Sequence, residues 1–274
     1  MRYAVKLPEQ RKQRYWLVDT GSLPEGEVLR RFYAEATQPT FRWLYDDTAY
    51  KGVRNSGPVL LDITQNSDFW QQCCTDWVGT AASVVIDTNE TLDELQQRLA
   101  THLTIHTLGN GKGLLRFHEP AVLHLLLGEE QLSPDGRLML MGKDTTWYWA
   151  LCLSQGTIIH EHCSSVNSED ITPNQALRLD DVTQQRLTSL RQFSRLMPLM
   201  GDAIDRFDLL QSEDEITSLW RALEQYWGAT WQTHLPRKQA VENARNMLVS
   251  SNALEQFIDE LGAYVQSSSL DAMR

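Results

Sequence analysis

The sequence predicts an α/β (α+β) fold class, with an N-terminal mixed-sheet α/β lobe followed by an all-helical C-terminal lobe. Up to about residue 165, short aromatic and β-branched runs alternate with helical patterns. Beyond about residue 175, every periodic segment is helical. The 274 residues are enough for two lobes with separate cores. We expect the lobes to span residues 1–165 and 173–274, joined by a polar linker.

The strands of the first lobe are predicted from runs rich in Val, Ile, Leu and aromatic residues. Turn-forming residues, such as Gly57-Pro58 and Gly109-Asn110-Gly111, separate these runs. A final pair of runs flanks Ser154-Gln155-Gly156 and is typical of a hairpin. The predicted strands are Tyr15–Asp19, Val59–Ile63, Ala82–Ile86, Leu114–Phe117, Thr146–Leu153 and Gly156–His162.

Helices of the first lobe are predicted between these strands. The segment Glu25–Glu35 has helical spacing. Thr91 and Glu94 form a capping box, and a leucine stripe from Leu92 to Leu103 follows it. Pro120 suits the first turn of a further helix.

The second lobe is predicted from helix-start signals and apolar stripes. Asp180 and Asp181 suit a helix start, and Pro198 breaks or kinks the pattern that follows. Ser212 and Glu215 form a second capping box before a helix that carries Leu219 and Leu223. The last stripe contains Leu254, Phe257, Ile258, Leu261 and Val265.

The charge of the chain limits its partners. The formal net charge of −11 repels phosphate backbones and anionic membrane surfaces, so we expect neither nucleic acid nor membrane binding. A basic or neutral protein partner is compatible with this charge. The N-terminal residues lack the apolar core of a secretory signal, and no stretch is long and apolar enough to span a bilayer. We therefore expect a cytoplasmic location, with reduced cysteines.

Motifs for covalent or metal chemistry are weak. The sequence has no G-x-S-x-G elbow, and the GNGKG segment lacks the spacing of a phosphate-binding loop. His160 and His162 would share one face of a strand, while Glu161 and Cys163 would lie on the other, which splits the ligands of a metal site. We expect no enzyme activity, catalytic residue, metal or other cofactor.

A charged group interrupts the apolar run from Gly113 to Leu127. Arg116 and Glu119 are costly to bury unless they are paired. We expect Arg116 to bind Glu119, or Asp62 on a neighbouring strand, and Pro120 to fix the strand-to-helix turn. The group either has a structural role or shapes a groove for a partner.

Nine tryptophans are unusually many, and the sequence alone does not assign all of them to the core. Trp147 lies in an alternating aromatic strand, so one face of that strand is expected to be buried. The helical lobe carries Trp220, Trp227 and Trp231, which fit either its core or an exposed protein-binding patch. These four residues are our candidates for partner binding.

The segment Leu115–Leu123 (LRFHEPAVL) resembles a signature of the type VI secretion effector adaptors, also called effector chaperones (Tap or TEC proteins). In that family the signature reads L-R-F/Y-x-D-P-R-V-L, so Glu119 and Ala121 depart from it. The resemblance covers about residues 13–150. Further segments that match in order are Tyr15–Thr20, Phe41–Tyr45, Gly57–Ile63, Gly79–Val84, Leu99–Leu103 and Met139–Gly142.

This resemblance implies a non-enzymatic cytosolic adaptor. Such proteins bind one cognate toxin and help to load it onto the tip of the secretion spike, a VgrG-type protein. Two alternatives remain open at this point. One is an immunity-type protein that neutralises a toxin by binding it, which the acidic charge also suits. The other is a small metal-dependent enzyme that uses His160 and His162.

Overall fold

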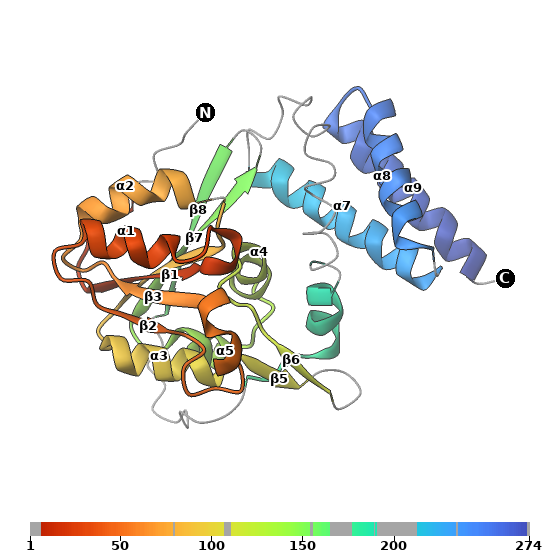
Figure 1. Cartoon of the computed structure of the whole chain (residues 1–274). Coiled ribbons are helices and arrows are strands. Elements are labelled where there is room, and N and C mark those ends of the chain that lie inside the picture. Colours follow the sequence, from red (N-terminus) through yellow and green to blue (C-terminus); the bar gives the residue numbers. More distant parts are fainter. Residues whose placement is uncertain are drawn as a thin grey trace. The chain divides into compact units, whose positions relative to one another are not determined.

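The computed structural model describes residues 7–78, 80–106, 111–153, 156–164, 177–188, 190, 213–233 and 235–272 (Figure 1). The chain divides into two compact units, Met1–Cys152 with Thr157–Thr183, and Leu153–Gly156 with Gln184–Arg274. The first unit carries the sheet and the second is helical, which confirms the predicted fold class. The linker was predicted at Cys163–Thr172, but Cys163 and Ser164 are the last residues of a strand, Gly156–Ser164. Residues 165–172 lie outside the described residues.

The first unit is built on a six-stranded sheet with the order β2-β3-β1-β4-β7-β8. A separate two-stranded sheet is formed by β5 and β6. The strands of the large sheet are β1 (Gln13–Asp19), β2 (Phe41–Trp43), β3 (Pro58–Asp62), β4 (Ser83–Thr88), β7 (Thr145–Leu153) and β8 (Gly156–Ser164). The strands of the small sheet are β5 (Thr104–His106) and β6 (Lys112–Leu114).

The prediction of a mixed sheet is wrong for the strand pairs whose register is described. The pairs β1–β3, β1–β4, β2–β3 and β4–β7 are all antiparallel. Because β3 and β4 both run opposite to β1, they are parallel to each other, but β1 lies between them. The alternation of strand and helix therefore produces a split βαβ arrangement, in which β1 separates the parallel strands β3 and β4.

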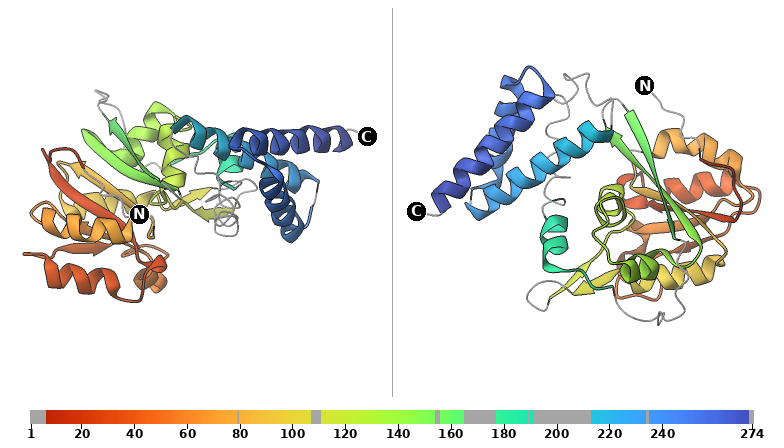
Figure 2. Two further views of the ribbon diagram at one scale, coloured as in Figure 1. Left: turned by 90° about the horizontal axis from the view of Figure 1, so that it is seen from above. Right: turned by 180° about the vertical axis from the view of Figure 1, so that it is seen from behind.

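Helices cover both faces of this sheet, as Figures 1 and 2 show. α1 (Glu27–Glu35) and α2 (Ser67–Trp77) lie on one face, and α3 (Leu92–Thr101) lies on the other. The predicted capping box at Thr91 and Glu94 is present at the start of α3. The remaining short helical segments are η1 (Thr20–Ser22), η2 (Lys51–Ser56), α4 (Pro120–Leu123), the π-helical η3 (His124–Gly128) and α5 (Pro134–Met141).

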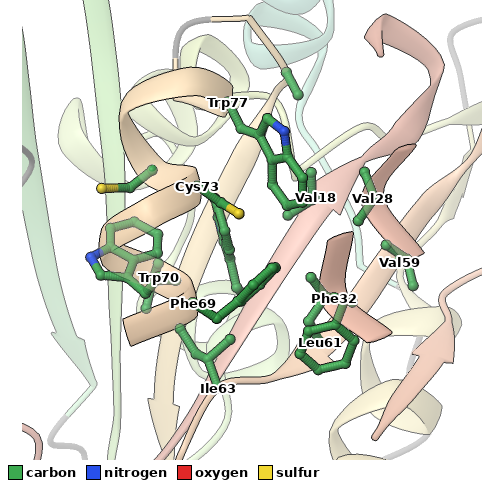
Figure 3. Close-up of a cluster of buried hydrophobic side chains, with 14 of the residues drawn as sticks. Val18, Val28, Phe32, Val59, Leu61, Ile63, Phe69, Trp70, Cys73 and Trp77 are labelled. Atoms are coloured by element: carbon green, nitrogen blue, oxygen red, sulfur yellow. The ribbon is translucent and has the colours of Figure 1, made fainter. Parts of the chain in front are cut away.

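The core on the α1 and α2 side is rich in aromatic residues (Figure 3). Trp16 of β1 lies at its centre, with ring centroids 4.6 Å from Trp70 and 5.2 Å from Trp77. Phe69 contacts Trp16 edge-on and Phe32 at 5.0 Å. This packing holds β1 against α1 and α2 on one face of the sheet.

The predicted strand Leu114–Phe117 is wrong at its C-terminal part, because β6 ends at Leu114. Leu115 donates its backbone N–H to Leu103 at 2.8 Å, and the N–H of Glu119 then bonds the Arg116 carbonyl at 2.9 Å. The chain therefore turns at Arg116 rather than continuing as a strand.

The second unit contains α7 (Glu213–Gln232), α8 (Arg237–Ser250) and α9 (Leu254–Ala272). Tyr226 of α7 connects all three: its ring lies 4.9 Å from Tyr264, and its hydroxyl donates to the Ala240 carbonyl at 2.8 Å. The predicted apolar stripes supply buried residues at Leu219, Leu223, Leu254, Phe257 and Leu261. The capping residue Ser212 and the kink at Pro198 lie outside the described residues. Within the described parts of the chain, no helix has the length and apolarity needed to cross a bilayer.

A buried ion pair joins two central strands of the first unit. Arg14 of β1 donates to both carboxylate oxygens of Asp87 in β4, at 2.6 and 2.7 Å. The Arg14 and Asp87 side chains are 9% and 7% exposed. Two parallel charge-assisted hydrogen bonds offset the cost of burying both groups.

We expect Arg14→Met to destabilise the protein by about 3–5 kcal/mol, because it leaves the Asp87 carboxylate buried without its cation. The double variant Arg14→Met/Asp87→Leu should recover part of this loss, because no charge is then stranded. Urea unfolding of the three proteins measures the difference. Equal stability of the single and double variants would contradict the assignment.

Candidate functional site

The candidate site lies at the C-terminal end of β1, where Asp19 is buried. The backbone N–H of Asp19 bonds the Ala82 carbonyl at 2.8 Å, which holds the residue in the sheet. Its Oδ1 accepts the N–H of Gly21 at 3.0 Å and so caps the short helix η1. The side chain is 5% exposed, so a cation at its other oxygen is needed to offset the burial of the charge.

Arg116 supplies that cation. Its Nη2 lies 2.5 Å from Asp19 Oδ2, and its Nε lies 2.6 Å from Glu119 Oε1. The guanidinium therefore bridges two carboxylates. The Arg116 and Glu119 side chains are 45% and 30% exposed, so the bridge is buried at Asp19 and open to solvent at Glu119. We call Asp19, Arg116, His118 and Glu119 the Asp19 network.

The alternative partner that we expected for Arg116, Asp62, is not in this network. Asp19 lies opposite Pro58 in the register of β1 and β3, whereas Asp62 lies opposite Tyr15. Asp62 is therefore at the other end of the strand pair. Four residues along the strand separate it from Pro58, the partner of Asp19, which is roughly 13 Å at about 3.3 Å per residue. Its carboxylate accepts the N–H of Thr64 at 2.9 Å.

His118 lies fully buried beside Asp19. Its Nε2 is 3.6 Å from Asp19 Oδ2, which is an ion-pair distance when the imidazole is protonated. Burial opposes ionisation of Asp19, but His118, the Gly21 N–H and the Arg116 guanidinium together lower its pKa below the ordinary value. The network thus keeps Asp19 charged.

Glu119 and Pro120 complete the turn after Arg116. Pro120 is in the first turn of α4, as predicted, and Glu119 is the residue before the helix. The Glu119 carbonyl accepts the N–H of Leu123 at 3.0 Å. The fixed φ of proline and the Arg116–Glu119 contact together set the direction of the chain into α4.

Gly57 and Tyr45 connect two further segments to the network. The Gly57 carbonyl accepts the Thr20 hydroxyl at 2.9 Å, next to Asp19. A Cβ on Gly57 would lie 2.5 Å from the Tyr45 ring, so only glycine allows this contact. Burial raises the pKa of Tyr45, whereas the nearby charge of Arg116 opposes that rise. The segments containing Tyr15–Thr20, Phe41–Tyr45, Gly57–Ile63 and Leu115–Leu123 therefore meet at one place.

His160 of β8 belongs to an aromatic cluster. The His160 ring stacks on Trp149 with centroids 5.5 Å apart, and it lies 4.7 Å from the His124 ring. Among the described residues, no group of three or more His, Cys, Asp or Glu side chains is placed to hold a metal ion. Cys73 and Cys163 are free thiols.

Of the four tryptophans proposed for partner binding, Trp147 and Trp227 have described side chains, and both are buried. Trp147 is fully buried, with its ring centroid 6.2 Å from Phe117, so it packs behind the turn that carries Arg116. Trp227 is 4% exposed. Neither indole offers an exposed face. The side chains of Trp220 and Trp231 lie outside the described residues.

Sequence reasoning missed Asp19, His118, Tyr45 and Gly57 as members of the site. Asp19 had a detectable signal, because a carboxylate ends the apolar strand Tyr15–Asp19 and needs a partner. For Gly57 the turn was predicted. The close packing of Gly57 on the Tyr45 ring was not, because local sequence signals do not specify how two separate segments pack.

Asp19→Asn should lower the free energy of unfolding at neutral pH by about 1–3 kcal/mol, because it removes the buried ion pair. The folded pKa of Asp19 is depressed, so its contribution is present above the unfolded pKa and is lost as pH falls through the folded pKa. The free energy of unfolding of the wild type should therefore fall as the pH drops below about 4. That of Asp19→Asn should fall less over the same range, because the variant has no carboxylate at this position to protonate. Urea unfolding between neutral and acidic pH tests this, and an unchanged profile would contradict it.

Gly57→Ala should destabilise the protein by about 1–3 kcal/mol, because the new methyl group overlaps the buried Tyr45 ring. The cause is steric, since the φ of −107° at Gly57 is open to alanine. Thermal unfolding measures the loss. Adding Tyr45→Leu should recover part of it, and a Gly57→Ala protein as stable as wild type would disprove the close contact.

Comparison with known proteins gives one family match. Residues 14–137 match the model of the family described as "Domain of unknown function (DUF4123)". No curated protein and no solved structure matches the chain. The matched region begins in β1, ends in α5 and contains every member of the Asp19 network.

Proposed function

We propose that the protein is a cytosolic adaptor that binds a cognate type VI secretion toxin and helps to load it onto a VgrG-type spike protein. The observation that carries this proposal is that four segments resembling the adaptor family meet at the Asp19 network. The family match over residues 14–137 covers all four segments.

The chemistry of the Asp19–Arg116 pair supports binding rather than catalysis. A guanidinium stays protonated in proteins, and the lowered pKa of Asp19 keeps its carboxylate ionised. Neither group therefore exchanges protons near neutral pH, as a general acid or base must. The two groups instead fix the position of the turn before α4.

The solvent-exposed part of the network is suited to recognition. Arg116 is anchored on its buried side by Asp19, while its exposed side and Glu119 lie at the surface. A pre-positioned guanidinium loses little conformational freedom when it binds a partner. Apolar contacts around it would supply most of the binding free energy.

The test is co-expression with a candidate toxin encoded by a neighbouring gene, followed by co-purification and affinity measurement. Arg116→Met should remain folded and weaken toxin binding about tenfold or more, since it removes an anchored charge. Arg54→Met is the matched control, because Arg54 is 44% exposed and pairs with Asp46 outside the network. Its binding should equal that of the wild type.

The outcomes separate the adaptor from its alternatives. A wild-type protein that does not co-purify with the toxin would overturn the proposal. If Arg116→Met is folded and binds normally, the network has a structural role only. An immunity-type protein would protect cells from the toxin, whereas an adaptor is required for toxin delivery and gives no protection.

A further inference from the structure

The Asp19 network carries an excess of negative charge. Two carboxylates, those of Asp19 and Glu119, share one guanidinium, that of Arg116. With the imidazole of His118 counted as neutral, the four side chains have a net charge of −1. His118 is fully buried and its Nε2 faces Asp19 at 3.6 Å, so it acts on the buried end of the network only. The excess charge therefore remains at the exposed end.

At the exposed end, the charge is carried by Glu119. Both oxygens of Asp19 are occupied, Oδ1 by the Gly21 N–H and Oδ2 by Arg116. Glu119 Oε1 lies 2.6 Å from Arg116 Nε. Within the part of the chain that the structure describes, Oε2 of Glu119 accepts no hydrogen bond, and Glu119 forms no ion pair besides that with Arg116. The side chain is 30% exposed, so Oε2 is the oxygen left for a partner.

Basic residues on the adjoining helix η2 do not balance this charge. η2 packs against η1 and carries Lys51 and Arg54. Lys51 lies 3.9 Å from Asp47, and Arg54 lies 2.9 Å from Asp46, so each already faces its own carboxylate. The described residues also contain no group of three or more His, Cys, Asp or Glu side chains that could hold a metal ion. A cationic group of another molecule would therefore complement Glu119.

The position of the Glu119 carboxylate is fixed before any partner binds. The Arg116 guanidinium that contacts it is anchored to the buried Asp19, and the Glu119 N–H bonds the Arg116 carbonyl at 2.9 Å. Pro120 restricts the residue before it to extended backbone, and Glu119 has φ −77° and ψ 121°. A carboxylate that is held through both its side chain and its backbone loses little conformational freedom on binding.

We propose that Glu119 binds a lysine side chain of the partner protein, with Arg116 as the residue that positions the carboxylate. The net charge of −11 also favours a basic partner. A single available oxygen suits the point charge of an ammonium group, whereas arginine pairs best with both oxygens of a carboxylate, and Oε1 is already occupied. The inference rests on the proposed function only in taking the toxin as the source of the lysine.

The first experiment measures the affinity of the candidate toxin for the full-length protein and for Glu119→Gln at two salt concentrations. Glutamine keeps an oxygen for Arg116 but has no negative charge, so the variant should remain folded, which urea unfolding checks. Toxin affinity should fall about threefold to tenfold at about 0.05 M sodium chloride. The difference from the wild type should shrink at about 0.5 M, because salt screens the lost attraction.

Glu27→Gln is the matched control for this experiment. Glu27 pairs with Arg30 of α1 at 3.1 Å, also with a spacing of three residues, and its side chain is 26% exposed. The control changes the net charge of the protein by the same amount as Glu119→Gln, so it should bind the toxin like the wild type. Equal affinity of the wild type and Glu119→Gln, or an equal loss in both variants, would overturn the proposal.

The second experiment does not use the toxin. A short synthetic peptide of alternating glycine and lysine is titrated into the full-length protein, and NMR follows the side-chain carboxyl resonances of Glu119 and Glu27. The Glu119 resonance should shift more than that of Glu27, and a glycine–arginine peptide should shift it less. A Glu119 resonance that responds no more than that of Glu27 would overturn the site. An equal or larger response to the arginine peptide would overturn the choice of lysine.

The two experiments separate this inference from the proposed function. If the toxin does not bind the wild type at all, the proposed function fails, and the peptide experiment alone decides whether Glu119 binds lysine. A peptide response at Glu119 without toxin binding would support the site and point to a different basic partner. Toxin binding that Glu119→Gln does not weaken would leave the adaptor proposal in place and overturn the lysine site.

Discussion

The architecture of the motif region depends on the buried charge of Asp19. A carboxylate at the end of a central strand is unfavourable unless donors surround it. Here the donors come from the following turn, through Gly21, and from a segment almost 100 residues away, through Arg116. The sheet and the turn before α4 therefore stabilise each other, because Asp19 obtains its cation from Arg116.

This requirement explains why short segments spread along the chain share one location. Gly57 approaches Tyr45 closely enough to exclude any side chain, and Thr20 bonds the Gly57 carbonyl beside Asp19. Trp147 packs behind the turn through Phe117. A rigid scaffold of this kind presents its exposed groups, Arg116 and Glu119, in one fixed geometry, which is what a binding surface needs.

Local sequence signals predicted local structure well in this chain. The runs that became β1, β3 and β4 are buried and β-rich, and the capping box at Thr91 marked the start of α3. Local signals carry no information on strand order, so the insertion of β1 between β3 and β4 was not predictable and the sheet was wrongly expected to be mixed. The same limit led to Asp62 as a partner for Arg116, because both Asp19 and Asp62 end apolar strands and only the register separates them. The burial of Trp147 and Trp227 was likewise not predictable from local signals. A tryptophan in a periodic pattern fits a hydrophobic core and a protein-binding surface equally well.

The central claim is that Asp19 and Arg116 act as one unit, and a double-mutant cycle tests it most directly. The cycle compares the free energies of unfolding of wild type, Asp19→Asn, Arg116→Met and the double variant in urea. Coupled residues predict that the double variant loses less stability than the sum of the two single losses, by roughly 1–2 kcal/mol. Losses that add within about 0.3 kcal/mol would show that the two residues are independent, and would contradict the account.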